Sequence, residues 1–228
     1  MVRIAVILTA LLAACSGAEH IEARYDGDAG LRYEGCISHA GEQPVAEGPW
    51  TFLFASGGVQ AEGEYLNGGL PGEADLLLDR TVVPSSGRTE WWSFWDEEGR
   101  LVAEGNYADG LRDDLWVTWY ENGSQCCSGK FAAGLEHGYH VHWDPEGRKR
   151  DTCTYVEGRL WGPRRVLDEN GRVVWAGEYE AGELISSDPP EAPEPQVHGL
   201  PACLAGVELG MAAPLDFAPG ELAEGLGQ

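Results

Sequence analysis

The feature that most constrains the fold of this chain is a repeat with a period of 24 residues. Four glycines lie 24 residues apart, and each is followed by an aromatic residue eight positions later and by a second glycine eleven positions later. The first glycines are Gly99, Gly123, Gly147 and Gly171, the aromatic residues are Tyr107, Phe131, Tyr155 and Tyr179, and the second glycines are Gly110, Gly134, Gly158 and Gly182. A period of this length is typical of chains that stack one small supersecondary unit many times.

An earlier copy begins near Trp50, with Gly57 in the place that Gly99 takes in the next copy. These two glycines are 42 residues apart instead of 24, so we place an insertion of 18 residues near 69–88. With a degenerate copy at its start, the repeat domain is expected over 31–185.

Turn residues indicate that each repeat is a pair of antiparallel strands. In the segment from Asp144 to Gly147, the ring of Pro145 fixes φ near −65°, which suits the second position of a type I turn. Gly147 then takes the left-handed position of a three-residue hairpin loop with a bulge. We expect the same loop at the second glycines, such as Gly110. The predicted fold is all-β, an elongated antiparallel β-meander of repeated hairpins.

Two segments show the repeat most clearly: Trp-Val-Thr-Trp-Tyr-Glu-Asn-Gly at 116–123 and Ala-Glu-Gly-Asn-Tyr-Ala-Asp-Gly at 103–110. They resemble MORN repeats, in the bacterial variant found in antitoxin-type proteins, and the resemblance extends over about residues 48–185. The last copy departs from the pattern, because Arg164 stands where earlier copies have tryptophan. The resemblance implies a ladder of hairpins that serves as a scaffold or binding surface, and it implies no catalytic residues.

Alternation along the strands assigns side chains to two faces of the sheet. We expect one face to form the core, with Leu115, Val117, Trp119, Cys127, Phe131, Leu135, Tyr139, Val141 and Trp143. The other face carries an aromatic row of Trp50, Phe52, Trp92, Phe94, Trp116 and Tyr120. Exposed aromatic rings suit a protein partner or stacked sugars, so this row is the candidate site for partner binding. The alternative is that the insertion or the C-terminal segment covers the row, or that it packs inside a curled sheet.

The first fifteen residues carry a targeting signal. One positive charge precedes eleven mostly apolar residues, too few for a helix that crosses a bilayer of about 30 Å. The sequence Leu12-Ala-Ala-Cys15 resembles the lipobox of bacterial lipoproteins, in which the cysteine thiol takes the lipid. We expect 1–14 to be a signal peptide, Cys15 to be lipidated and 15–30 to form a flexible tether. Cleavage after Ala14 without lipidation is the alternative.

This resemblance places the protein in the bacterial cell envelope. It implies a lipid anchor in a membrane, and the serine that follows the cysteine favours the outer membrane over the inner one. Two or three acyl chains hold a protein stably, whereas one chain binds reversibly.

Composition narrows the classes of function. The chain has 38 acidic and 15 basic side chains, a formal net charge of −23, so nucleic acid is not an expected partner. No serine lies in a strand-turn-helix elbow, and no glycine loop is followed by the residues that cradle phosphate. We therefore expect neither an enzyme nor a cofactor.

Histidines near a pair of cysteines raise the question of a metal site. In the expected register only His140, His142 and Cys126 converge, whereas Cys127 and Cys153 point to the other face. We therefore expect no metal ion, and we expect the histidines to be solvated.

The cysteines leave their pairing open. Apart from Cys15 there are five, so at least one is free or pairs between molecules. Cys127 and Cys153 are expected two strands apart, about 9.6 Å, beyond the limit of about 7 Å for a disulfide. A bond from Cys36 or Cys153 to Cys203 stays open.

The character of the chain changes beyond the repeats. Residues 186–195 form a proline-rich acidic linker, and 196–228 form a tail that either docks on the sheet or stays disordered. The expected function is that of a lipid-anchored, non-catalytic envelope protein whose sheet binds another envelope protein. The alternatives are an immunity or antitoxin protein, whose acidity suits a basic toxin, and a protein that binds cell-wall glycan.

Overall fold

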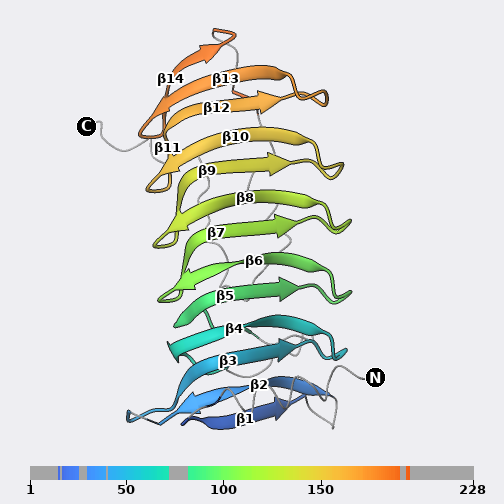
Figure 1. Cartoon of the computed structure of the whole chain (residues 1–228), viewed down its shortest axis with the longest axis vertical. Coiled ribbons are helices and arrows are strands. Elements are labelled where there is room, and N and C mark those ends of the chain that lie inside the picture. The colour runs from blue at the N-terminus through green and yellow to red at the C-terminus, as the bar shows by residue number, and fades with distance from the viewer. Residues whose placement is uncertain are drawn as a thin grey trace, which may run out of the picture.

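The computed structural model describes residues 15, 17–25, 30–39, 41–71, 82–190 and 194–195. They form one open sheet of 14 antiparallel strands, stacked in chain order from β1 to β14 (Figure 1). Only β11 leaves this path, because it pairs with β10 alone. The predicted all-β meander of sequential hairpins is confirmed. The expected signal peptide at 1–14 and the tail at 196–228 lie outside the described residues.

Apart from the two-residue β11, the strands run from 6 to 10 residues. Their bounds are β1 Glu19–Arg24, β2 Leu31–Ser38, β3 Val45–Leu53, β4 Val59–Gly68, β5 Arg88–Trp95, β6 Leu101–Ala108, β7 Leu111–Trp119, β8 Gln125–Ala132, β9 Leu135–Trp143, β10 Lys149–Val156, β11 Arg159–Leu160, β12 Gly162–Leu167, β13 Val173–Glu180 and β14 Glu183–Asp188.

The first loop of each repeat has the predicted form. Gly147 has a φ of 77°, and its N–H donates to the carbonyl of Asp144 at 2.8 Å. The N–H of Asp144 donates in turn to the carbonyl of Arg148 at 2.9 Å, which closes the loop. The corresponding glycines, Gly99, Gly123 and Gly171, have φ values of 78°, 82° and 76°.

The second loop of each repeat is shorter than predicted. Ala108 pairs directly with Leu111, so only two residues form the turn. Both have positive φ, 51° at Asp109 and 79° at Gly110, which is the type I′ conformation. The expectation of a three-residue loop here is wrong, because Asp-Gly accepts two left-handed positions in succession and needs no third residue.

A bulge in each repeat decides which side chains share a face. Trp119 pairs with Gln125, but Thr118 pairs with Cys127, so Cys126 is an extra residue on its strand. An extra residue reverses the alternation that follows it. Cys127 and Phe131 therefore lie on the same face as Trp116, opposite to the face that we expected. We call the face of Trp116 the inner face and the opposite one the outer face.

The inner face forms the core, which corrects the expected assignment. Trp50, Phe52, Trp92, Phe94 and Trp116 are between 0 and 3% exposed and belong to one hydrophobic cluster. On the outer face, Leu115 is 40% exposed and Tyr139 is 56% exposed. Large aromatic rings bury more apolar area per residue than leucine or valine, so the aromatic face gains most from packing.

Glycines on neighbouring strands make room for the inner rings. A Cβ at Gly35 would lie 2.1 Å from the ring of Trp50, and one at Gly105 would lie 2.4 Å from the ring of Trp116. The indole N–H of Trp116 donates to the backbone carbonyl of Asn106 at 2.8 Å. The same arrangement recurs at Gly63 under Trp92 and at Gly129 under His140.

The described end of the insertion packs onto the inner face. Val83 is 1% exposed and belongs to the aromatic cluster. The guanidinium of Arg88 lies 5.0 Å from the ring centre of Trp92 and donates to the carbonyls of Val83 and Pro84, each at 2.8 Å. The insertion thus covers part of the aromatic row, as the alternative interpretation held. Residues 72–81 lie outside the described part of the chain.

Candidate binding surface

The aromatic row that we expected to bind a partner is not accessible. Its rings contact one another, with centroids 5.9 Å apart for Trp92 and Phe94 and 6.4 Å apart for Phe94 and Trp116. Tyr120 is half-buried, and its hydroxyl donates to the carbonyl of Trp143 at 2.8 Å. The prediction of an exposed binding row is therefore contradicted, and these residues hold the sheet together.

An exposed apolar row lies instead on the outer face. Trp91, Leu115 and Tyr139 are 45%, 40% and 56% exposed, and they are 24 residues apart. They stand on β5, β7 and β9, so neighbours in the row are two strands, or about 9.6 Å, apart. We call these three residues the outer stripe. The signal for it was the 24-residue spacing of large residues, two of which were expected in the core.

A groove opens at the ends of the later hairpins. Its volume is about 650 Å³, within the range of small-ligand sites. Leu135, Val156 and Trp161 supply its apolar lining, and His137 and Arg159 supply polar groups. Trp161 is 45% exposed, so the groove presents an open indole.

The later repeats replace aromatic rings on the inner face with polar side chains. Cys127, His142 and Asp151 pair across three successive strands and so lie side by side on this face. Cys153 pairs with His140 in the same way. The expectation that these cysteines point away from the histidines is wrong, because the bulges shift the register.

These polar residues do not form a metal site in the described part of the chain, where no three His, Cys, Asp or Glu side chains are placed to hold an ion. His140 is held by the backbone, with Nε2 2.9 Å from the carbonyl of Lys130. It therefore occupies the place of the tryptophan rings. The expectation of solvated histidines is contradicted as well, since His140 is 1% and His142 6% exposed.

Burial favours the neutral form of the two histidines. It lowers the pKa of His142 below its usual value, against the opposing effect of the nearby Asp151. It lowers the pKa of His140 too, although the hydrogen bond to Lys130 acts the other way. Both ring nitrogens of His142 are buried and form no hydrogen bond.

Arg164 takes the ring position in the last repeat and forms a buried ion pair. Its guanidinium lies 2.7 Å from Asp151 Oδ2, and the side chains are 12% and 4% exposed. Burial opposes the charged form of Arg164, but the hydrogen bond and charge of Asp151 raise its pKa. Arg164 also contacts the carboxylate of Glu194, which brings the end of the predicted linker back to the sheet.

The free thiols of the described residues are expected to be poorly reactive. Cys127 and Cys153 are buried and unpaired, in agreement with the expectation that they do not bond to each other. Burial raises the pKa of both thiols, for Cys153 to about 12. The neighbour of the Cys127 sulfur is Thr118 Oγ1 at 2.9 Å, which is not a base. A thiol in this state is a poor nucleophile.

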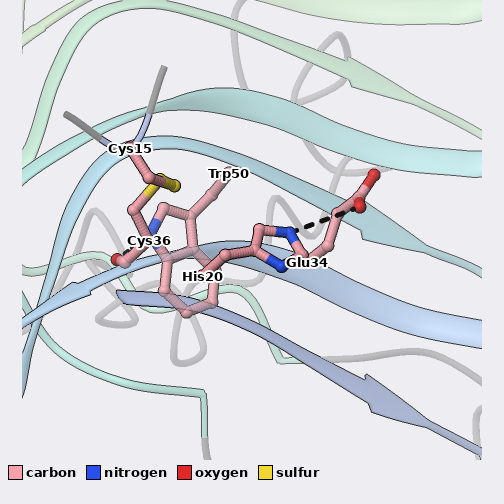
Figure 2. Close-up of a disulfide and its surroundings, with 5 residues drawn as sticks. All are labelled: Cys15, His20, Glu34, Cys36 and Trp50. Atoms are coloured by element: carbon pink, nitrogen blue, oxygen red, sulfur yellow. Dashed lines mark hydrogen bonds and ion pairs between the residues drawn. A yellow bond between two sulfur atoms is a disulfide. The ribbon is translucent and has the colours of Figure 1, made fainter. Parts of the chain in front are cut away.

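Cys15, the predicted lipidation site, is bonded to Cys36 with their Cα atoms 5.6 Å apart. Figure 2 shows the pair beside His20 and Glu34, whose Nε2 and Oε2 atoms are 3.7 Å apart. The strand β1 covers Glu19–Arg24, so this part of the segment 15–30, expected as a flexible tether, belongs to the sheet. The described residues include no helix long and apolar enough to span a bilayer.

Comparison with known proteins adds no assignment. No protein-family model matches the chain. No curated protein matches it either. A solved GtfA/B complex bound to UDP and GlcNAc is 11% identical with a TM-score of 0.20, covering 69% of this chain and 23% of that one.

Two structures of TarM are similarly distant. A mutant of S. aureus TarM in complex with fondaparinux, alpha-GlcNAc-glycerol and UDP is 8% identical with a TM-score of 0.16, and a second TarM structure is 9% identical with a TM-score of 0.17. Each match covers 75% of this chain, and the chain spans only 23% of those proteins. Likenesses of this size carry no inference about fold or function.

Proposed function

We propose that this chain is a lipid-anchored, non-catalytic protein of the bacterial cell envelope, and that its MORN-like sheet binds another envelope protein through the outer face. The observation that carries the proposal is the outer stripe of Trp91, Leu115 and Tyr139. These three large apolar side chains are 40 to 56% exposed and stand in one row, whereas the aromatic rings of the inner face are buried. Asn106 and Lys130 pair with the stripe on the strands between, so the surface is apolar with a polar rim, as interaction sites often are.

The inner face supports a scaffold instead of an enzyme. Its polar residues are buried, its free thiols have raised pKa values, and its ion pair is satisfied internally. A reaction needs groups that reach a substrate, and these groups contact one another. The sheet therefore acts through its shape and its outer side chains.

Affinity capture tests the binding surface. Exchanging Trp91 and Tyr139 for serine is expected to abolish capture of a partner from the native membrane, while the β-type circular dichroism stays unchanged. Val173 and Val174 on β13, 51% and 52% exposed, provide the control, because their exchange for serine removes apolar surface outside the stripe. Equal loss with both pairs would refute a site at the stripe.

The anchor has its own test, because one sulfur cannot hold both a lipid and a disulfide. If Cys15 carries a thioether-linked lipid, Cys36 is left as a thiol. Mass spectrometry of the mature N-terminal peptide is expected to find diacylglycerol on Cys15 and a Cys36 that alkylates after unfolding. An N-terminal peptide that contains an unmodified Cys15, or one bonded to Cys36, would rule out the anchor.

A further inference from the structure

A row of carboxylates crosses the outer face next to the outer stripe. The strand register pairs Thr51 with Glu62, Glu62 with Ser93, and Ser93 with Glu104. Glu34 pairs with Thr51 and begins the same row. Directly paired residues share a face, so Glu34, Glu62 and Glu104 stand two strands apart, at intervals of about 9.6 Å. We call these three residues the acidic row.

The row is not neutralised within the described part of the chain. No lysine or arginine there forms an ion pair with any of the three, whereas loop carboxylates such as Asp96 and Asp144 pair with Arg100 and Arg148. Glu34 is 3% exposed, and its Oε2 accepts no hydrogen bond although His20 is 3.7 Å away. Glu62 and Glu104 are half-buried and form the open part of the row.

Placing Glu34 and Glu62 on the sheet costs stability. Burial raises the pKa of Glu62, and the charge of Glu34 raises it further. Burial likewise raises the pKa of Glu34, in spite of His20. Glu62 is disfavoured as a carboxylate in the folded chain and forms no ion pair within the described residues, which points to a cation supplied from outside.

An aromatic side chain stands next to the open carboxylates. Trp91 is 45% exposed, and its indole N–H donates to Glu104 Oε2 at 3.3 Å. A carboxylate beside an open indole can receive the guanidinium of arginine, which pairs with the first and stacks on the second. Lysine offers only a point charge there.

From this arrangement we propose that the acidic row is the docking site for a basic, extended polypeptide segment of the partner, with arginine over Glu62 and Glu104. A chain in the polyproline II conformation rises about 3.1 Å per residue and turns once in three residues, so every third side chain lies on the same side at about 9.3 Å, close to the spacing of about 9.6 Å. The partner segment therefore carries arginine at every third position and lies across the strands. This inference rests on the proposed function, because it names the ligand class of the same outer face.

Peptide binding tests the inference on the full-length protein. The probe is the peptide Arg-Gly-Ser-Arg-Gly-Ser-Arg-Gly-Ser-Arg, and the comparison peptides are one of equal composition with its arginines adjacent and one with lysine for arginine. The spaced arginine peptide is expected to bind most tightly and to weaken with salt. Exchanging Glu62 and Glu104 for glutamine is expected to weaken it at least tenfold.

Exposed loop residues provide a control of equal charge. Exchange of Glu97 and Glu121 for glutamine removes two charges from exposed loop positions and is expected to change the affinity less than twofold. Glutamine preserves shape, and the Glu62 exchange is expected to raise the Tm at neutral pH while it weakens binding. Equal loss of affinity in both variants, or equal affinity for spaced and adjacent arginines, would overturn the inference.

The two proposals fail separately. Capture of a partner that depends on Trp91 and Tyr139, together with no binding of the spaced peptide, would leave the binding surface standing and remove the basic ligand class. The opposite result is also possible: the exchange of Glu62 and Glu104 weakens peptide binding, and the exchange of Trp91 and Tyr139 does not change capture of a partner. This result would support the basic ligand class and remove the outer stripe as the binding surface.

Discussion

The indole of Trp116 lies against the backbone of Gly105, so closely that a Cβ at Gly105 would stand 2.4 Å from the ring. Exchange of Gly105 for alanine is therefore expected to cost about 1–3 kcal/mol in the free energy of unfolding, since the ring has to move within a packed core. Urea titration followed by tryptophan fluorescence measures this. A Cβ at Gly30 would have no atom within 4 Å, so Gly30→Ala is the control and is expected to have little effect.

Trp91 and Trp92 are chain neighbours on opposite faces. Trp92 is 0% exposed, and its exchange for alanine is expected to cost about 3–5 kcal/mol. Trp91 is 45% exposed, and the same exchange is expected to change the free energy of unfolding by about 0.5 kcal/mol or less. Thermal unfolding of the two variants checks this, and similar losses would mean that the inner and outer faces are assigned wrongly.

His142 is expected to make the protein acid-sensitive. Its pKa is lowered on folding, so the unfolded chain binds the proton more readily. Stability should therefore fall as the pH drops below about 6.5, the ordinary value for histidine, towards the lowered pKa. Asp151, His140, Arg164 and Cys127 surround the ring or act on it.

Exchange of His142 for phenylalanine isolates this contribution. The variant is expected to lose part of the acid dependence of its free energy of unfolding, measured by urea titration from pH 7 to pH 5. His137 is exposed, so His137→Phe serves as the control. A variant whose pH profile runs parallel to that of the parent would show that His142 is not responsible.

The ion pair of Arg164 and Asp151 is expected to be costly to break from one side. Arg164→Met leaves a carboxylate that is 4% exposed without its cation, with an expected loss of about 3–5 kcal/mol. The double exchange with Asp151→Asn removes both charges and is expected to recover most of the loss. Chemical denaturation of the single and double variants measures these free energies of unfolding. If the losses of the two single variants add up in the double variant, the two residues are not a coupled pair.

The two free thiols are expected to resist alkylation in the folded protein. Burial raises the pKa of Cys153 to about 12, and that of Cys127 is raised by the same cause. Iodoacetamide at pH 8 is therefore expected to label neither within the time that labels both in urea. Peptide mapping locates the label, and rapid native labelling at either site would show that the inner face opens readily.

Much of the fold could be predicted from sequence because hairpin loops leave a local signature. Gly147 and its equivalents mark the left-handed positions, and their spacing gives the strand count. The assignment of side chains to the two faces was harder to predict. Cys126 is one extra residue in a bulge, and nothing in the composition of the strand indicates it. A single displaced residue moved Cys127 and Phe131 to the other side of the sheet.

The candidate site depended on that same step. Trp91 and Trp92 are adjacent in sequence and equally aromatic, so only the register separates an exposed ring from a buried one. The acidic row could not be found without pairing Glu62 with Ser93 across the insertion, since these residues belong to different repeats. The contact between Cys15 and Cys36 could not be predicted either, because it depends on β1 pairing with β2 in the sheet.

Because every strand pairs with its neighbour along the chain, contacts in this molecule join segments that follow one another in sequence. Loop closure between distant segments is thus a small part of the entropic cost of folding, and a growing sheet offers an edge to each new hairpin. A chain that is synthesised from its N-terminus can add one hairpin at a time, before the rest has arrived. Unfolding should begin at the terminal strands, which have a neighbour on one side alone, and move inward one hairpin at a time.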